Sequence, residues 1–453
     1  MPTSEPLPEV LAVRPLSSAP RISVRIPGSK SITNRALLCA ALADGRTTLR
    51  GALFADDTLA MVDAVGALGA RVDGDERAGT MVVHGVGTDA SSPSRAASAP
   101  VPEVQARDSG TTSRFILPAV ALSPARCVVD GNEQLRVRPF APLLDALKQL
   151  GAIIEPLGRP GFLPVAVTGP ARGGHVMVPG HISSQFLSGL LMAGALMPAG
   201  LEVELTSPLV SVPYVEMTAA VMRSFGVETD GLRVAPGAYR PRDYLVEPDA
   251  SAASYFLAAA ALTGGEITVE GLGTSSIQGD ARFAEVLEAM GAKVDRGPDA
   301  VTVVGTGALH GIDIDMSDIS DTAQTLAATA VFADSPTRVR GIGFIRGKEV
   351  DRIGLLVAEL RRAGIDAVEH EDGFTVNPGP VHAARFESHH DHRMAMSLSL
   401  IGLRTPGIEI SGPACVAKTY PRFFGDLASL RSTSSVRSRP PPSSRTTRHP
   451  GSG

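Results

Sequence analysis

The chain has 453 residues, of which 43% are hydrophobic and 20% charged, as in globular proteins large enough to form two domains. No apolar run approaches the ~20 residues that a membrane helix needs, and three scattered cysteines cannot form a disulfide framework. The net charge is −5, and residues 431–453 contain five arginines and no acidic residue, so the rest of the chain has a net charge of −10. This negative charge and the absence of Trp argue against nucleic-acid binding by residues 1–430. Residues 1–20 lack the apolar stretch of a secretory signal, so we expect a cytoplasmic protein that contacts neither membrane nor nucleic acid.

The first informative run, PGSKSITNR at residues 27–35, leads into a predicted helix over residues 32–42. Lys30, Arg35 and small hydroxyl residues lie at the helix start, where free backbone N–H groups and the helix dipole favour an anion. A nucleotide P-loop needs Lys directly after Gly, whereas Ser29 separates Gly28 from Lys30 here. The run therefore predicts an anion site of another kind, and the alternative is a solvated helix start.

Two short patterns recur along the chain and predict internal repeats. One is a β-rich segment that ends in Gly, at Gly51, Gly131, Gly271, Gly341 and Gly412, with a weaker copy without Gly at residues 201–205. The other is a helix that stops at Gly, at Gly69, Gly151, Gly226, Gly291 and Gly364. Since one strand–helix–strand–helix–strand–strand unit cannot cover its own sheet, several α/β units are expected to pack around buried helices. A seam near residues 240–247 divides them into two halves, with a ligand cleft between the halves.

Polar residues suited to anions recur at predicted helix starts and strand-to-helix turns. They fall at residues 30–35, 108–114, 136–139, 183–186, 211–214, 321, 346–352, 391–393 and 417–419. Each run alone is compatible with an ordinary surface. Together they predict one cleft that holds two highly charged small anions.

At these runs the chain resembles the 5-enolpyruvylshikimate-3-phosphate synthase family. The matching segments, which cover about residues 22–426, are PGSKSITNRALL, SGTTSRF, RVRPFAPLLDAL, SSQFLSGLL, SVPYVEMT, EPDASAASYFLAAAAL, DTAQT, RGKEVDR, DHRMAM and AKTYPRFF. The resemblance implies an α/β fold, a two-domain inverse α/β barrel of six βαβαββ repeats, three per domain. It implies one domain over residues 28–246 and another over residues 1–27 and 247–430. The Ser/Arg/Pro-rich tail, residues 431–453, is expected to be disordered.

The resemblance also implies a reaction. The enolpyruvyl group of phosphoenolpyruvate is transferred to the 5-hydroxyl of shikimate 3-phosphate, and phosphate is released through a tetrahedral intermediate. This is a step of the shikimate pathway to aromatic amino acids. No metal or organic cofactor is expected, and a monomer is the family's usual state. The alternative acceptor is that of the sister family, UDP-N-acetylglucosamine enolpyruvyl transferase, which typically has Lys-Asn where this chain has Lys30-Ser31. A non-catalytic repeat scaffold is the alternative from a different class.

Residue roles carried over from the family fall into three groups. The resemblance implies that shikimate 3-phosphate is bound by Ser31, Arg35, Ser183, Ser184, Ser211 and Tyr214, with Gln185 between the two substrates. It implies that phosphoenolpyruvate is held by Lys30, Gly110, Arg138, Arg352, Arg393 and Lys418, with Lys348 facing the region between the anions. The candidate proton-transfer groups are Asp321, Glu349 and Lys30. Asp321, which also contacts substrate, is expected to deprotonate the 5-hydroxyl, and protonation of C3 of phosphoenolpyruvate stays open between Glu349 and Lys30.

The chain departs from the family pattern at a few places. Asp108-Ser109 stands where many relatives have Asn-Ala, and Phe344 and Phe115 stand where a polar residue and a Pro are frequent. These differences concern substrate contacts and not the class of reaction. Retention of Gly110 predicts sensitivity to glyphosate, an inhibitor that resembles phosphoenolpyruvate.

Overall fold

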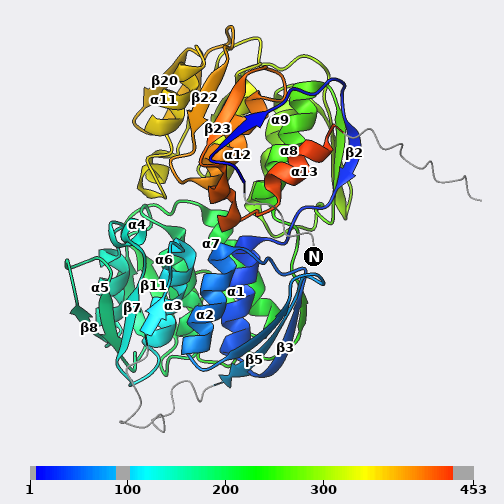
Figure 1. Cartoon of the computed structure of the whole chain (residues 1–453). Helices are drawn as coiled ribbons and strands as arrows, with labels where there is room; N and C mark the ends of the chain where they lie inside the picture. The colour runs from blue at the N-terminus through cyan, green and yellow to red at the C-terminus, as the bar shows by residue number, and fades with distance from the viewer. Residues whose placement is uncertain (1–6, 88–102, 432–453) are drawn as a thin grey trace, which may run out of the picture.

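The computed structural model describes residues 7–87 and 103–431, so the tail predicted to be disordered lies, beyond Arg431, outside the described residues. The chain forms two lobes, and Figure 1 shows the first lobe, blue to green, below the second, which runs from green to red and also contains the blue strand β2 (Arg21–Val24). Each lobe has its own hydrophobic core, one within residues 32–246 and the other within residues 13–26 and 250–430. Because the cores divide in this way, we propose domain limits of 28–246 and of 1–27 with 247–430.

Small sheets form the outer layer of each lobe, and six of them are present in the described part of the chain. In the first lobe they are β14(Asp243–Leu245)-β3(Asp44–Arg50)-β5(Thr80–Val86)-β4(Arg71–Asp75), β6(Glu103–Gln105)-β7(Cys127–Asp130)-β9(Val165–Thr168)-β8(Ile153–Pro156) and β10(Gly174–Val178)-β11(Leu201–Leu205)-β13(Arg233–Val234)-β12(Thr229–Asp230). In the second lobe they are β2(Arg21–Val24)-β15(Glu266–Glu270)-β17(Ala300–Val304)-β16(Lys293–Arg296), β18(Asp313–Asp315)-β19(Thr337–Arg340)-β21(Gly373–Val376)-β20(Ala367–His370) and β22(Ala384–Glu387)-β23(Ile408–Ser411)-β1(Val10–Val13). In every sheet the first two strands are parallel and each later strand pairs antiparallel with its neighbour.

The predicted α/β fold class, an inverse α/β barrel of six units, is confirmed. Each recurrent β-rich segment is the second strand of one sheet, and the weak copy at residues 201–205 is β11. The glycines that stop helices before the next strand have φ between 78° and 105°, which is the left-handed region that favours glycine. The sixth sheet has three strands, because β1 from the N-terminus pairs with β23 and closes it.

Helices fill the inside of the lobes. The inner helices are α1(Lys30–Ala41), α3(Gly110–Val120) and α6(Ser184–Gly194) in the first lobe, and α8(Ala250–Thr263), α10(Ala323–Ala330) and α12(His392–Ile401) in the second. The others are α2(Asp56–Ala67), α4(Glu133–Arg136), α5(Ala141–Gln149), α7(Val212–Ser224), α9(Phe283–Ala289), α11(Gly354–Arg362) and α13(Phe423–Ser429), with short 3₁₀ turns η2(Gly279–Arg282), η3(Ser320–Thr322), η4(Gly343–Gly347) and η5(Pro413–Lys418). Almost every residue of α1, α3, α6, α8, α10 and α12 is buried. Across residues 7–87 and 103–431, no helix is long and apolar enough to cross a bilayer.

The chain crosses between the lobes twice, and the two crossings lie side by side. The first lies between β2 and α1 and the second between β14 and α8. The Ser29 N–H donates to the Glu247 carbonyl at 2.8 Å, and the Asp249 N–H donates to the Pro27 carbonyl at 2.9 Å. This paired segment fixes where the lobes join and brings the starts of α1 and α8 together.

Candidate active site

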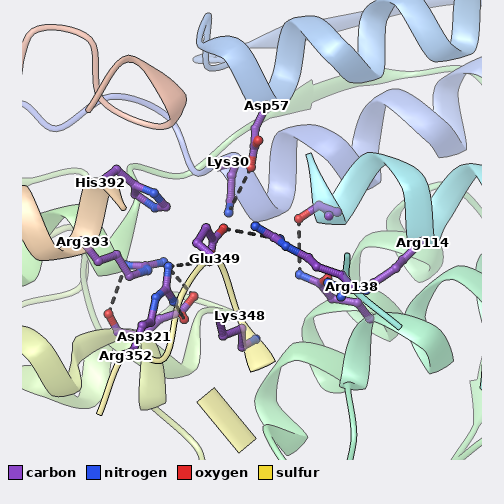
Figure 2. Close-up of a pocket in the computed structure, with 13 residues that line it drawn as sticks. Lys30, Asp57, Arg114, Arg138, Asp321, Lys348, Glu349, Arg352, His392 and Arg393 are labelled. Carbon is purple, nitrogen blue, oxygen red and sulfur yellow. Dashed lines mark hydrogen bonds and ion pairs between the residues drawn. The ribbon is translucent and has the colours of Figure 1, made fainter. Parts of the chain in front are cut away.

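A cavity lined by charged side chains lies between the two lobes (Figure 2). The first lobe contributes Lys30, Asp57, Gly110, Thr111, Arg114, Arg138 and Gln185, and the second contributes Asp321, Lys348, Glu349, Arg352, His392 and Arg393. Its cationic side chains outnumber its carboxylates by six to three. The free space is only ≈ 30 Å³, because the charged groups of the two lobes meet each other across it.

Inner helices begin at this cavity, and capping residues fix where they begin. Ser29, Ser109 and Ser183 each accept a hydrogen bond from a backbone N–H in the first turn of α1, α3 and α6. Asp249 and Asp391 do the same for α8 and α12. Helix α1 starts at Lys30, two residues earlier than predicted, because Ser29 is its cap. First-turn residues of α1, α3, α6 and α12 line the cavity, so the positive ends of these four helices add to its preference for anions, whereas the start of α8 lies at a smaller adjoining cavity.

The second lobe contributes a chain of buried ion pairs. Arg352 donates from Nε to Oδ2 of Asp391 at 2.7 Å and from Nη2 to Oε2 of Glu349 at 2.7 Å. Arg352 Nη1 lies 3.3 Å from Oδ1 of Asp321, and Arg393 Nη2 donates to Oδ2 of the same carboxylate at 2.7 Å. Arg352 is 2% exposed and Asp391 is fully buried, so this network is shielded from water and holds both guanidinium groups in fixed positions.

Two carboxylates join cations from both lobes. Asp57 lies 3.5 Å from Lys30 Nζ and 3.3 Å from Lys418 Nζ, which comes from η5 of the second lobe. Oε1 of Glu349 lies 3.9 Å from both Arg138 Nη1 of the first lobe and Lys418 Nζ. These pairs pull the lobes together across the cavity.

The charges in the cavity shift its titrating groups. Burial opposes ionisation of Asp321, but Arg393, Lys348 and Arg352 together hold the pKa of this carboxyl well below its usual range. Burial likewise opposes ionisation of Glu349. The charges of Arg352, Arg138 and Lys418 outweigh burial and hold the pKa of Glu349 well below its usual value. Burial lowers the pKa of Lys348 to about 8 although Asp321 opposes the shift. Both carboxyl groups are therefore ionised, and Lys348 loses its charge as the pH rises through about 8.

Arg114 and Gln185 form one wall of the cavity. Arg114 Nη1 donates to Oε1 of Gln185 at 2.7 Å, and the amide of Gln185 donates to Thr111 at 3.3 Å. The Arg114 guanidinium lies over the rings of Phe140 and Phe186, at 5.6 Å and 5.5 Å from their centroids. This packing holds the guanidinium, and through it the amide of Gln185, in one orientation.

The structure brings most of the predicted residues into this cavity and leaves some beside it. Of the predicted residues, the lining contains Lys30, Gly110, Arg138, Gln185, Asp321, Lys348, Glu349, Arg352 and Arg393. Ser31 lines a smaller adjoining cavity, and Lys418 lies at the edge through its contacts with Asp57 and Glu349. Tyr214 reaches the site through a 3.1 Å contact between its hydroxyl and Asp321.

The remaining predicted residues lie outside the lining. Ser183 and Ser184 form the buried start of α6. Ser211 directly precedes α7 but makes no side-chain capping bond, and its hydroxyl lies 3.5 Å from the Ser317 carbonyl. Arg35 is 1% exposed and uses its guanidinium inside the first lobe, where it donates to Thr218, Ser188 and the carbonyls of Ser31 and Tyr214. Its guanidinium therefore braces the elements that carry Ser31 and Tyr214.

Asp57 and Arg114 line the cavity but were not among the predicted site residues, whereas His392 belongs to the predicted polar run 391–393. Asp57 follows another acidic residue in the first turn of a helix, which is an ordinary preference of the helix dipole. Arg114 lies within the quoted SGTTSRF run, but nothing in the run distinguishes it from a surface Arg. His392 is buried, and neither ring nitrogen has a hydrogen-bond partner among the described residues, although Nδ1 lies 3.9 Å from Oδ1 of Asp391. Burial beside Arg393 holds the pKa of His392 well below its usual value. It therefore lines the site as a neutral imidazole.

Comparisons with known proteins agree with this geometry. The family model described as EPSP synthase (3-phosphoshikimate 1-carboxyvinyltransferase) matches residues 18–427. The chain is 42% identical over 427 residues to a 3-phosphoshikimate 1-carboxyvinyltransferase of Trichormus variabilis, covering 92% of this chain and 98% of that protein. It is 43% identical over 416 residues to that of Serratia proteamaculans, covering 90% of this chain and 96% of that protein.

Solved structures give the same result. An EPSP synthase from Acinetobacter baumannii superposes with a TM-score of 0.78 at 29% identity and covers 93% of this chain and 98% of that one. The enolpyruvyl transferase NikO from Streptomyces tendae shares the fold, with a TM-score of 0.71 at 20% identity over 93% of this chain and 97% of that one. The family match spans nearly the whole chain, and the site at its centre is built for anions. The chain therefore belongs to the EPSP synthase (3-phosphoshikimate 1-carboxyvinyltransferase) family.

Proposed function

We propose that the cavity between the lobes is the site at which this transferase moves the enolpyruvyl group of phosphoenolpyruvate to the 5-hydroxyl of shikimate 3-phosphate and releases phosphate. The observation that carries this proposal is the excess of cations in a cavity at which inner helices begin. Both substrates are polyanions, so the site must supply more positive than negative charge. A non-catalytic scaffold has no need for such a buried charged network.

Five of the cations lie together and form the proposed phosphoenolpyruvate subsite. Lys30, Arg138, Arg352, Arg393 and Lys418 surround Glu349, Asp57 and Asp321, and Gly110 leaves the backbone close to Arg138. The carboxylate and the phosphate of phosphoenolpyruvate each offer pairs of oxygen acceptors, as do the protein's carboxylates that these guanidinium groups now contact. The substrate thus takes the place of internal ion pairs, and Lys348 lies between the two anions.

The second subsite belongs to shikimate 3-phosphate. Ser31, Ser183, Ser184 and Ser211 supply hydroxyl donors near the helix starts, and Tyr214 supplies a hydroxyl oxygen. Arg35 supports them from within the lobe, and Gln185 lies between the subsites. Hydroxyl groups and backbone N–H groups suit a phosphate monoester and ring hydroxyls.

The proton transfers fall to three titratable groups. Asp321 is ionised, so it is able to accept the proton of the 5-hydroxyl as that oxygen attacks C2 of phosphoenolpyruvate. The proton for C3 comes from Glu349 or Lys30. Glu349 must first gain a proton, which becomes easier once phosphoenolpyruvate draws Arg352 away. Glu349→Gln and Lys30→Gln variants assayed in D₂O separate the two, because only loss of the donor abolishes deuterium incorporation at C3.

The test of the reaction is phosphate release by the purified protein with phosphoenolpyruvate and either shikimate 3-phosphate or UDP-N-acetylglucosamine, in the presence of a chelator. We expect release with shikimate 3-phosphate alone. Release with the nucleotide sugar alone would assign the other acceptor. No release with either would leave the fold without this activity. The monomeric state and the cytoplasmic location stay predictions.

A further inference from the structure

A buried aspartate lies behind Asp321 and outside the proposed substrate contacts. Asp280 belongs to η2 and is 4% exposed. The hydroxyl of Tyr214 lies between the two carboxyl groups, 3.2 Å from Oδ2 of Asp280 and 3.1 Å from Oδ2 of Asp321. The hydroxyl of Ser251, in the first turn of α8, also contacts Oδ2 of Asp280. In the described part of the chain Oδ1 of Asp280 is buried and has no hydrogen-bond partner.

The protons available for these contacts are too few if both carboxyls are ionised. Three oxygen–oxygen contacts, Ser251 to Asp280, Asp280 to Tyr214 and Tyr214 to Asp321, need three protons to be hydrogen bonds. Each hydroxyl supplies one proton, and an ionised carboxylate supplies none. Burial and the neighbouring carboxylates raise the pKa of Tyr214 well above its usual value, so its hydroxyl keeps its proton but has only one. The third proton must be on a carboxyl group.

Asp280 is the carboxyl group better suited to hold that proton. Asp321 bonds to Arg393 at 2.7 Å and faces Arg352 at 3.3 Å, whereas Asp280 makes no ion pair with any residue that the structure describes. Burial and the charge of Asp321 raise the pKa of Asp280 to about 7. An unpartnered Oδ1 also costs less free energy on a neutral acid than on a carboxylate.

We propose that Asp280 is a positioning residue, held as a neutral acid that donates to Tyr214 and so directs the single proton of Tyr214 to Asp321. The inference rests on the proposed function, in which Asp321 is the base. The Tyr214 hydroxyl occupies Oδ2 of Asp321 and leaves Oδ1, with only the longer contact to Arg352, to receive the proton of the substrate hydroxyl. Tyr214 keeps one lone pair for shikimate 3-phosphate.

A dependence on pH follows from this arrangement. The charged or titrating groups that face Asp280 are Asp321 from η3, Tyr214 from α7, Asp249 at the start of α8 and Arg393 from α12. As the pH rises through about 7, Asp280 ionises, one of the three hydrogen bonds loses its proton, and a second negative charge faces Asp321. We expect kcat to fall over this range.

The first test does not depend on turnover. Infrared spectra of protein labelled with ¹³C-carboxyl aspartate, compared between wild type and Asp280→Asn, report a protonated carboxyl directly. We expect the C=O band of a neutral acid at about pH 6, lost at about pH 9 and absent from Asp280→Asn. If no such band exists in the wild type at about pH 6, Asp280 is ionised and the inference is wrong. This reading holds even if the protein proves to have no transferase activity.

The second test measures the consequence for catalysis. We expect Asp280→Ala to lower kcat about tenfold with KM for both substrates changed less than about twofold, and Asp280→Asn to restore most of that loss. Asp280→Asn should also lack the fall in kcat near neutral pH, because its amide donates at every pH. Equal losses in the two variants, or the same pH profile in Asp280→Asn and wild type, would show that Asp280 has only a structural role.

Discussion

Replacing Asp321 by Asn tests the centre of the proposed mechanism. The amide has the shape of the carboxylate and accepts hydrogen bonds through its carbonyl oxygen, but it cannot take a proton from the 5-hydroxyl. Loss of a positioned general base costs about 10²–10⁴ in rate, so we expect kcat to fall by about that factor. Arg393, 6% exposed and now bonded at 2.7 Å, would face a neutral group and become freer to bind phosphoenolpyruvate, so KM for that substrate should not rise.

Asp321→Asn should also lower the free energy of unfolding, so the variant must be shown to be folded before its kcat is interpreted. Removing one partner from a buried pair costs about 3–5 kcal/mol when nothing replaces it, and Asn replaces part of the bonding, so the loss should stay below that range. The assay is phosphate release at saturating substrates, with a melting curve to show that the variant is folded. Asp318→Asn is the matched control, because Asp318 pairs with Arg282 at 3.1 Å where both are nearly half exposed, and such a pair contributes about 0–1 kcal/mol. A folded Asp321→Asn variant with kcat within about threefold of wild type would refute the assignment of Asp321 as the base.

Three further predictions follow from the site. The pKa of Lys348 is lowered to about 8, so its charge should be lost as the pH rises through about 8, and kcat/KM for phosphoenolpyruvate should fall with it. Lys348→Arg should move this fall to higher pH, and an unchanged pH profile in the variant would exclude Lys348 as its source. Asp391→Ala removes one of the two 2.7 Å partners of Arg352 and the cap of α12, so the free energy of unfolding should drop by about 3–5 kcal/mol in denaturant titrations. Asp391→Asn keeps a capping oxygen and should lose less. A Cβ at Gly110 would lie 3.0 Å from Arg138 Nη1, so Gly110→Ala should raise both KM for phosphoenolpyruvate and the inhibition constant of glyphosate. If millimolar glyphosate does not inhibit the wild-type protein, the predicted sensitivity is wrong.

The fold was predictable because its signals are local. A glycine that stops a helix, such as Gly69 or Gly151, adopts a positive φ that other residues disfavour, so the sequence marks the position directly. The β-rich segments alternate because each strand has one buried face, as in β15, and this pattern is also visible without a structure. Pairing between distant strands is not local. That β14 joins the sheet of β3, or that β1 closes the last sheet, depends on where the chain crosses between lobes.

Part of the site was predictable because some of its residues also lie in local sequence patterns. Lys30 and Gly110 lie at helix starts, where capping serines and small residues produce recognisable runs. Asp280 and Asp57 give no such signal, because their importance comes from groups far away in the sequence. Asp280 meets Tyr214, 66 residues earlier in the chain, only after η2 and α7 pack together at the lobe interface.

Substrate binding must rearrange the ion pairs that now fill the cavity. With ≈ 30 Å³ of free space, phosphoenolpyruvate and shikimate 3-phosphate cannot enter unless charged side chains move or the lobes separate. The ion pairs that join the lobes across the cavity include Lys418 with Asp57 and Arg138 with Glu349, whereas the hydrogen bonds at Ser29 lie where the chain crosses between the lobes. Each substrate anion then offers those cations a new partner, so binding exchanges one set of buried charge pairs for another. The net affinity is therefore a small difference between two large electrostatic terms, and for this reason removing one carboxylate of the site should change substrate binding less than removing one of its cations.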